Sequence, residues 1–415
     1  MYEALASQDN LYTLVTKNSK CTQVEVIGSI VEYLYAAEAS SSVINQFAKD
    51  DTRIVSLTVT EKAYMVDDST GDLDEKHPLI VHDLENPGAP KSPIGYVVAG
   101  LRARRNLGKD PFTVLSCDNL PLNGKLTQRV CLQFAERIDP ELASWIRERV
   151  RFPSSMVDRI TPATTEEDVT LLKEDHGLED AWPVCAEDYI QWVIEDNFSL
   201  GRPKWEDHGA LLVEDVEPYE LMKLRLLNGS HSALAYVSHL LGHRQVHHAM
   251  EDSDVSHFVA DYMENITPTV PRVPGVDLSS YKKILLERFS NPNVSDQVPR
   301  IAEDGSKKFQ AFVRDALEEL LSEGKETKHI AGAVAGWIHY CRGVDDLGEQ
   351  ITINDPKADE LKEMAHLTVT KGSNPFLNKF LSKDIAASEK FNADVDRFLR
   401  KVEVDGTRGL LQMLR

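Results

Sequence analysis

The chain has 415 residues, enough for two or three domains, and its 42% hydrophobic and 27% charged residues are ordinary for a globular protein. Its formal net charge of -21 repels nucleic-acid phosphates and anionic membranes, so we expect no nucleic acid and no membrane as a partner. A neutral small molecule fits this charge most easily, and an anionic substrate would need a local basic pocket.

The cysteines and the N-terminal residues indicate the compartment. The five cysteines are scattered and never have C-x-x-C spacing, which argues against a disulfide framework and against a cysteine-based zinc site. Residues 1–15 contain Glu3 and Asp9 and no apolar run, so they do not resemble a signal peptide. The longest mostly apolar run, residues 330–338, is far shorter than the ~20 residues of a spanning helix. We therefore expect a cytoplasmic protein.

The first half of the chain alternates strand-like and helix-like segments. The predicted strands are 53–60, 111–116 and 155–158, and the predicted helices are 95–107, 126–138 and 142–150. This alternation favours parallel strands joined by helical crossovers. The polar stretch 71–92 contains a glycine and three prolines among its helix breakers, and it is predicted to be a loop.

The second half is predicted to be mainly helical. Its strongest segment is 309–321, in which the apolar residues follow the i, i+3, i+4, i+7 spacing throughout. Further helices are predicted at 219–248, 330–342, 359–367 and 385–402. We place the domain boundary after Gly201-Arg202-Pro203, so that the domains are 1–211 and 212–415.

The most informative segment lies at the start of the second half. On an α-helix, Glu220, Lys223, Asn228 and His231 would fall within about 140° of one another and form one polar stripe. Leucines and other apolar residues occupy the remaining surface, so the helix would be largely buried. Burial would lower the pKa of the lysine, as a general base near neutral pH requires. The alternative is a solvated helix face with a glutamate–lysine pair three residues apart.

Two shorter segments follow predicted strands. Asn119, in Ser116-Cys-Asp118-Asn119-Leu-Pro121, could donate a hydrogen bond to a developing alkoxide, because ligands bind at the carboxyl ends of parallel strands. The alternative is an ordinary turn. Asp158 and Arg159 also follow a strand, and the pair is compatible with a structural role or with a site.

Together these segments resemble a known family. The Asp118-Asn119 turn, the Val157-Asp158-Arg159-Ile160-Thr161-Pro162 signature and Lys223-x4-Asn228-x2-His231 occur in the order seen in the mannitol dehydrogenase family of long-chain, polyol-specific dehydrogenases. The resemblance extends over nearly the whole chain, from residues 4–15 through 58–61 and 191–196 to 342–346. It implies an α/β Rossmann-like N-terminal domain, incomplete at its N-terminus, followed by a mainly α-helical C-terminal domain.

The resemblance also implies a role for each residue. Lys223 resembles the general base, and Asn119 and Asn228 resemble the pair that holds the alkoxide oxygen. Glu220 and Asp158 resemble a proton path from the lysine to solvent. His231, Arg300 and Lys308 resemble substrate contacts, and Thr60, Glu61 and Asp158 are expected to contact the cofactor, NAD. No metal is implied, because the lysine takes the place of zinc.

Three histidines raise the question of a metal. His239, His243 and His247 recur every fourth residue, and two of them on one helix could bind zinc. The sequence lacks the H-E-x-x-H pattern, and Arg244 lies beside His243. We expect packing or surface histidines and no metal.

One family feature is missing from the sequence. The chain contains no G-x-G-x-x-G motif, the turn that brings the backbone close to a cofactor pyrophosphate. The resemblance begins after the point where this turn should lie, so the domain is expected to be truncated there, and the residue that selects NAD over NADP is expected to be missing with it.

The resemblance implies NAD-dependent oxidation of a polyol to a ketose, D-mannitol to D-fructose. We expect the protein to act as a monomer. The alternatives are a sugar-acid oxidoreductase, such as a fructuronate or tagaturonate reductase, and an arabinitol dehydrogenase. An alternative of another class is a truncated, cofactor-deficient chain without enzymatic activity.

Overall fold

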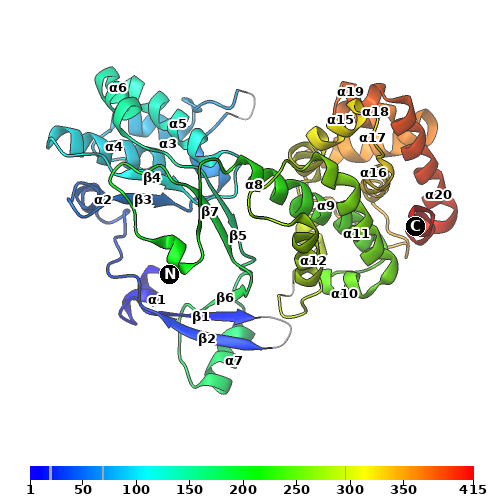
Figure 1. The fold of residues 1–415 in the computed structure, drawn as a ribbon, viewed down its shortest axis with the longest axis horizontal. Coiled ribbons are helices and arrows are strands. Elements are labelled where there is room, and N and C mark those ends of the chain that lie inside the picture. The colour runs from blue at the N-terminus through cyan, green and yellow to red at the C-terminus, as the bar shows by residue number, and fades with distance from the viewer. Residues whose placement is uncertain (18–20, 68–69, 295) are drawn as a thin grey trace. The chain divides into compact units, whose positions relative to one another are not determined.

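The structure is a computed structural model that describes residues 1–17, 21–67, 70–294 and 296–415. The described chain divides into two compact units, and the division falls between Glu217 and Pro218, a few residues after the boundary placed at 211. Both units can be followed in Figure 1. We call them the N-terminal unit and the C-terminal unit and describe each by itself.

The N-terminal unit contains all the strands of the described chain. They are β1 (Tyr12–Lys17), β2 (Thr22–Ile27), β3 (Ile54–Leu57), β4 (Thr113–Ser116), β5 (Ser155–Asp158), β6 (Val184–Glu187), β7 (Gln191–Glu195) and β8 (Leu211–Val213). Its helices are α1 (Tyr2–Ala6), α2 (Ser40–Phe47), α3 (Pro78–Glu85), α4 (Pro93–Asn106), α5 (Asn123–Ile138), α6 (Pro140–Arg149) and α7 (Glu166–His176), with 3-10 turns η1 (Glu61–Tyr64) and η2 (Trp205–His208).

The strands form three small sheets, in the orders β2-β1-β6, β3-β4 and β5-β7-β8. The pairs β3–β4, β1–β6 and β7–β8 are parallel, whereas β1–β2 and β5–β7 are antiparallel. The prediction of parallel strands is therefore correct for β3 and β4 and wrong for the antiparallel pairs. An antiparallel pair such as β1–β2 needs only a short connection and no crossover helix.

The β3–β4 pair lies in the main core of the N-terminal unit. Val55, Leu57 and Val114 pack with apolar side chains of α4, α5 and α6, including Val97 and Phe134. These helices are drawn on one side of the pair in Figure 1. The predicted helices 95–107, 126–138 and 142–150 correspond to α4, α5 and α6.

The stretch 71–92 is more ordered than predicted. It contains α3, which begins with Pro78 in its first turn, and the His77 side chain accepts a hydrogen bond from the Leu79 N–H. Ile80 and Asp83 of this helix are buried. The loop prediction was wrong for 78–85, because proline is well tolerated in the first turn of a helix, and it was correct for 71–77 and 86–92.

One edge of β3 has no strand beside it among the described residues. The Thr113 and Cys117 N–H groups of the β4 side donate to the carbonyls of Arg53 and Leu57, both at 2.8 Å. Backbone groups alternate in direction along a strand, so those of Ile54 and Ser56 point to the opposite edge. Within the described part of the chain, no strand pairs with the hydrogen-bonding groups of that edge.

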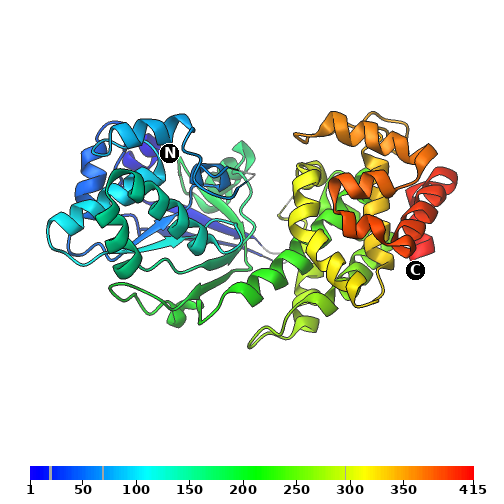
Figure 2. The same ribbon diagram turned by 90° about the horizontal axis from the view of Figure 1, so that it is seen from above.

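The described part of the C-terminal unit is helical throughout, in agreement with the predicted fold class, and both views show it as coiled ribbon joined by loops (Figures 1 and 2). Its α-helices are α8 (Glu217–Met222), which begins at the division, α9 (Gly229–Leu240), α10 (Val246–Glu251), α11 (Ser253–Ile266), α12 (Leu278–Phe289), α13 (Val298–Ala302), α14 (Gly305–Phe309), α15 (Asp315–Ser322), α16 (Lys328–Tyr340), α17 (Ala358–Lys371), α18 (Asn374–Phe380), α19 (Lys383–Ala387) and α20 (Glu389–Leu414). The others are the π-helical turns η3 (Lys223–Asn228) and η5 (Gln310–Arg314) and the 3-10 turn η4 (Thr267–Thr269).

The core of the C-terminal unit contains α9 and α16. The apolar run 330–338 lies within α16 and is buried among neighbouring helices. Three predicted helices are divided: 219–248 becomes α8, η3, α9 and α10, 309–321 is interrupted by η5, and 385–402 corresponds to α19 and the longer α20. None of the described helices is long and apolar enough to cross a membrane.

Candidate active site

Lys223 and Glu220 are both buried, with 7% and 6% of their surface exposed. They lie on consecutive segments, Glu220 on α8 and Lys223 at the first position of η3. The buried neighbours Met222 and Leu226 belong to the same segments, which explains why the sequence buries a charged residue here. A solvated helix face, the alternative left open by the sequence, does not agree with this burial.

Lys223 and Asn228 bracket one turn of π-helix. The N–H of Gly229 bonds to the carbonyl of Leu224, five residues earlier. On an ordinary α-helix, residues five apart are rotated by about 140°, whereas the wider turn made by i to i+5 bonding brings them closer to the same face. The uniform α-helix predicted for this segment is therefore wrong at this turn, and the π turn aligns the lysine and the asparagine more closely than predicted.

Asn228 and His231 continue the same polar stripe. Among the described atoms, the side-chain oxygen of Asn228 is buried and has no hydrogen-bond partner. The His231 ring stacks on Phe289 of α12, with ring centroids 4.2 Å apart. Four of the predicted residues, Glu220, Lys223, Asn228 and His231, therefore follow one another along α8, η3 and α9.

A second group of predicted residues lies where β3 and β4 end. Asp118 joins the two strand ends, because its carboxylate accepts hydrogen bonds from the N–H groups of Val59, at 3.1 Å, and Thr60, at 2.8 Å. Asn119 follows directly and is exposed, as are Thr60 and Glu61. Thr60 has a φ of 70°, an uncommon conformation for a threonine, at the start of η1.

Sequence reasoning did not identify Asp118 or its partner Tyr64 as organisers of these strand ends. The Tyr64 hydroxyl donates to Asp118 at 2.7 Å and lies 2.5 Å from the Ser116 hydroxyl. Desolvation raises the pKa of Tyr64, so the phenol stays protonated. Tyr64 and Asp118 are 54 residues apart in sequence, and no local pattern indicates their contact.

Asp158 is buried at the end of β5, with 6% of its surface exposed. Its neighbour Arg159 has a structural role, because the guanidinium donates to the Glu187 carbonyl at 3.1 Å and to the Thr16 hydroxyl at 3.2 Å.

Arg300 and Lys308 lie close in sequence and differ in environment. Arg300 is exposed and forms an ion pair with Asp296 at 2.6 Å. Lys308 is half-buried, and its ammonium donates to the Ile301 carbonyl at 2.8 Å. Desolvation lowers the pKa of Lys308, and the nearby Asp304 carboxylate partly opposes this effect.

The turn that carries Lys308 is held by Asp355, another residue that sequence reasoning missed. The Asp355 carboxylate accepts hydrogen bonds from the backbone N–H and the hydroxyl of Ser306, both at 2.8 Å. It therefore caps the start of α14, which has no cap from its own N-cap residue.

The predicted residues thus form separate groups within each unit. Thr60, Glu61 and Asn119 lie at or beside the two strand ends that the Asp118 carboxylate joins, and Asp158 lies on another sheet of the same unit. Lys223, Asn228 and His231 belong to the C-terminal unit. The convergence of Asn119 with Lys223 on one substrate stays a prediction.

The carboxyl ends of β3 and β4 are the expected position of a dinucleotide cofactor. Exposed polar residues at the carboxyl ends of β3 and β4 lie where a Rossmann-type sheet places its cofactor. Gly124, at the start of α5, does not supply a phosphate cradle, because a Cβ there would lie 2.5 Å from the Phe152 carbonyl and the space is already filled. Gly124 therefore offers no space for a cofactor pyrophosphate at the start of α5.

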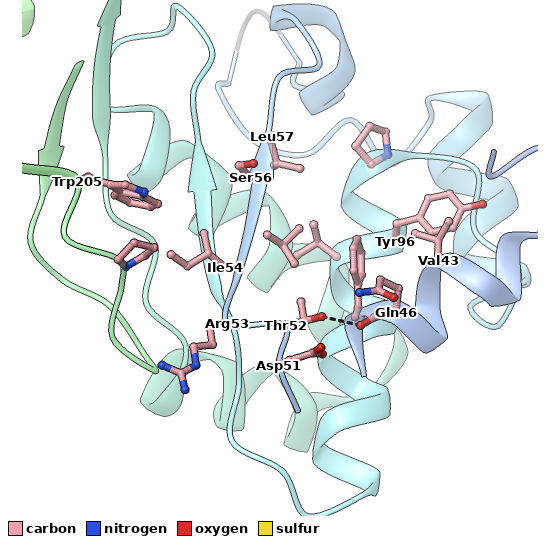
Figure 3. Close-up of a pocket in the computed structure, with 15 residues that line it drawn as sticks. Val43, Gln46, Asp51, Thr52, Arg53, Ile54, Ser56, Leu57, Tyr96 and Trp205 are labelled. Carbon is pink, nitrogen blue, oxygen red and sulfur yellow. Dashed lines mark hydrogen bonds between the residues drawn. The ribbon is translucent and has the colours of Figure 1, made fainter. Parts of the chain in front are cut away.

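The N-terminal unit also contains an apolar pocket of about 750 Å³ beside the open edge of β3 (Figure 3). Residues 53–57 line it, together with Phe47, Tyr96 and Trp205. None of the predicted site residues lies in this pocket, so we do not assign the chemistry to it.

The three histidines do not share one helix. Helix α9 ends at Leu240, so His239 lies on α9, His243 follows it and His247 lies on α10. His243 is 3.4 Å from an oxygen of Asp252. Among the described residues, no group of three or more His, Cys, Asp or Glu side chains could hold a metal ion.

A parallel strand pair with exposed polar residues at its carboxyl ends, as at β3 and β4, is a feature of Rossmann-type dinucleotide-binding domains. Family models agree: residues 1–207 match the mannitol dehydrogenase Rossmann domain, and residues 215–403 match the mannitol dehydrogenase C-terminal domain. The chain belongs to the mannitol dehydrogenase family. It is therefore an oxidoreductase of the dehydrogenase class.

Individual relatives resemble the chain over nearly its full length. It is 41% identical to mannitol 2-dehydrogenase of Neosartorya fischeri and 42% identical to that of Aspergillus fumigatus, and each match covers 98% of this chain and 82% of the relative.

Two solved structures of other dehydrogenases also resemble the chain. The Pseudomonas fluorescens mannitol 2-dehydrogenase, in a ternary complex with NAD and D-mannitol, matches with a TM-score of 0.85 and 41% identity over 99% of this chain and 84% of that chain. A D-sorbitol dehydrogenase in substrate-free form matches with a TM-score of 0.92 and 33% identity over 99% and 85%.

Proposed function

We propose that the protein oxidises D-mannitol to D-fructose with NAD and that Lys223 is the general base. The observation that carries the proposal is the pairing of a buried lysine with an asparagine one π turn away. Burial disfavours the charged ammonium relative to the neutral amine, and the neutral amine is the form that can accept a proton.

In this proposal Lys223 accepts the proton of the reacting hydroxyl through its Nζ atom. Asn228 and Asn119 donate hydrogen bonds to the oxygen as it becomes an alkoxide, and this requires the two units to bring them together. Glu220, three residues before Lys223, begins a proton path that continues through Asp158. NAD supplies the acceptor for the hydride that leaves the carbinol carbon.

The remaining residues have positioning roles in the proposal. His231, Arg300 and Lys308 contact the other hydroxyl groups of the substrate, and Thr60, Glu61 and Asp158 contact the cofactor. The Asp296 carboxylate partly neutralises Arg300, which favours a neutral polyol over a sugar acid at this position. Mannitol is favoured over other polyols by the names of the relatives at 41–42% identity.

We also propose that the protein acts as a monomer in the cytoplasm with domains 1–211 and 212–415. The proposed catalytic residues all come from one chain, and the buried thiols of Cys131, Cys185 and Cys341 are compatible with a reducing compartment. The mass in solution, measured with and without NAD, tests the oligomeric state.

The test of the catalytic proposal is NAD reduction with D-mannitol, D-sorbitol, D-arabinitol and the sugar acids as substrates. Lys223→Ala should lower kcat by ~10²–10⁴-fold, the usual contribution of a general base. An added primary amine should restore part of the activity.

Lys282→Ala is a matched control, because Lys282 lies in the same unit, is also 7% exposed and pairs with Glu264 at 2.6 Å. It should leave kcat near that of the parent. Near-normal turnover by Lys223→Ala would rule out the lysine base, and preference for a sugar acid would rule out the polyol.

A further inference from the structure

We propose that Arg225 and Glu319 are a positioning pair that holds the π turn between Lys223 and Asn228. This inference rests on the proposed function, because the turn matters for catalysis only if Lys223 and Asn228 act together. Neither Arg225 nor Glu319 is among the residues assigned to the chemistry above.

The anchor is visible in the contacts of Arg225, which lies in the middle of η3. Its side chain is 11% exposed, and Nη1 donates to the Thr269 carbonyl and to an oxygen of Glu319, the latter at 3.0 Å. Thr269 is the last residue of η4, after α11, and Glu319 lies on α15. One side chain therefore ties the π turn to two neighbouring segments.

A π turn needs such anchors because it departs from ordinary helix geometry. The structure contains one extra residue per turn at η3, and π turns of this kind are rare and frequently functional. If η3 relaxed to α-helix, Asn228 would rotate away from Lys223 by about 100°, the rotation of one residue. The two groups could then no longer meet the same oxygen atom.

The packing of η5 against η3 explains why Glu319, the partner of Arg225, lies on α15. Helix α15 follows η5, the second π turn of the unit, and η5 packs against η3. Glu319 is 38% exposed on its side chain, whereas Arg225 is largely covered. The ion pair therefore neutralises a guanidinium that the packing of the two π turns has taken out of water.

The experiment compares Arg225→Ala, Glu319→Ala and the charge swap Arg225→Glu/Glu319→Arg in the full chain. Two quantities are measured: hydrogen exchange of the Gly229 N–H, which bonds to Leu224, and kcat for mannitol oxidation. Arg225→Ala should speed the exchange at Gly229 and lower kcat by ~10–100-fold, the cost of misplacing a reacting group, while KM for NAD stays within about twofold. The swap restores the ion pair but not the hydrogen bond to the Thr269 carbonyl, so it should recover only part of both quantities.

Arg342→Ala is a matched control. Arg342 pairs with Glu403 at 2.9 Å, and the exposed fractions of that pair, 11% and 38%, equal those of Arg225 and Glu319. Arg342→Ala should reduce thermal stability without changing Gly229 exchange or kcat.

Unchanged Gly229 exchange in Arg225→Ala would overturn the anchoring role, and faster exchange with parental kcat would overturn the positioning role. If the parent oxidises no polyol, the proposed function fails by itself, and the exchange measurement still decides whether the pair holds the π turn.

Discussion

The Tyr64 hydroxyl donates a hydrogen bond of 2.7 Å to Asp118, the same carboxylate that accepts the N–H groups of Val59 and Thr60. The two residues thereby join the carboxyl ends of β3 and β4, which carry Thr60, Glu61 and Asn119. The same carboxylate therefore holds Thr60, a proposed cofactor contact after β3, and the turn that carries the Asn119 amide after β4.

Asp118→Ala should therefore affect both stability and activity. It leaves three donors without their acceptor, so we expect the free energy of unfolding to fall by about 1–3 kcal/mol, together with a rise in KM for NAD and a lower kcat. Urea titration and steady-state kinetics measure these changes. Tyr64→Phe removes only one donor and should have a smaller effect. Asp50→Ala, which removes an exposed carboxylate paired with Lys109, is the control. Equal losses of stability and activity in Asp118→Ala and Asp50→Ala would contradict the role of Asp118 in joining the two strand ends.

Gly305→Ala should destabilise the turn that carries Lys308. An added Cβ would lie 2.5 Å from the Tyr236 hydroxyl and 2.8 Å from Nε1 of Trp337, both in the core. Overpacking of this kind costs about 1–3 kcal/mol, and displacement of α14 should raise KM for the polyol. Thermal unfolding and polyol titration test this. Gly88→Ala, where an added Cβ meets nothing within 4 Å, should behave like the parent. If Gly305→Ala unfolds at the same temperature as the parent, the core makes room for the added methyl group and the prediction is wrong.

His239 should make the protein sensitive to acid. Desolvation lowers its pKa from 6.5 to about 4, so between these values the unfolded chain binds a proton that the folded chain does not. Stability attributable to this residue is complete above pH 6.5 and is lost as the pH falls toward 4, by about 3 kcal/mol in total.

His239→Gln should therefore lose less stability than the parent between pH 7 and pH 4.5 in urea titrations. His257→Gln, at an exposed position, serves as the control because it should keep the parental slope. Identical pH slopes for the parent and His239→Gln would mean that His239 is protonated as easily in the folded protein as in the unfolded chain.

Ser56→Lys should reduce self-association. Ser56 is exposed on β3, whose open edge adjoins the apolar pocket of about 750 Å³. Unpaired strand edges recruit other strands, and lysine on an edge opposes this. We expect the parent to associate at high concentration and Ser56→Lys to do so less, as measured by light scattering. Ser144→Lys, on helix α6, adds the same charge away from the edge and should not help. Equal effects of the two variants would attribute the change to net charge alone.

Local sequence patterns determined much of the secondary structure. The spacing of apolar residues in 126–138 and 309–321 predicts faces that are indeed buried, for example at Phe134 and Leu317. The spacing of apolar residues predicts these helices because each helix must bury one apolar face, whichever elements it packs against. The family resemblance, carried by segments such as 157–162 and 223–231, was likewise available from the sequence and is confirmed by the family models.

Tertiary structure decided the features that depend on distant partners. Apolar spacing records which side of a helix is buried and not which carbonyl each N–H reaches, so the π turn from Lys223 to Asn228 could not be predicted. The antiparallel pairing of β5 with β7 and the contact between Tyr64 and Asp118 join segments tens of residues apart. Such contacts form only when the whole chain packs, because their stability comes from excluding water around both partners at once.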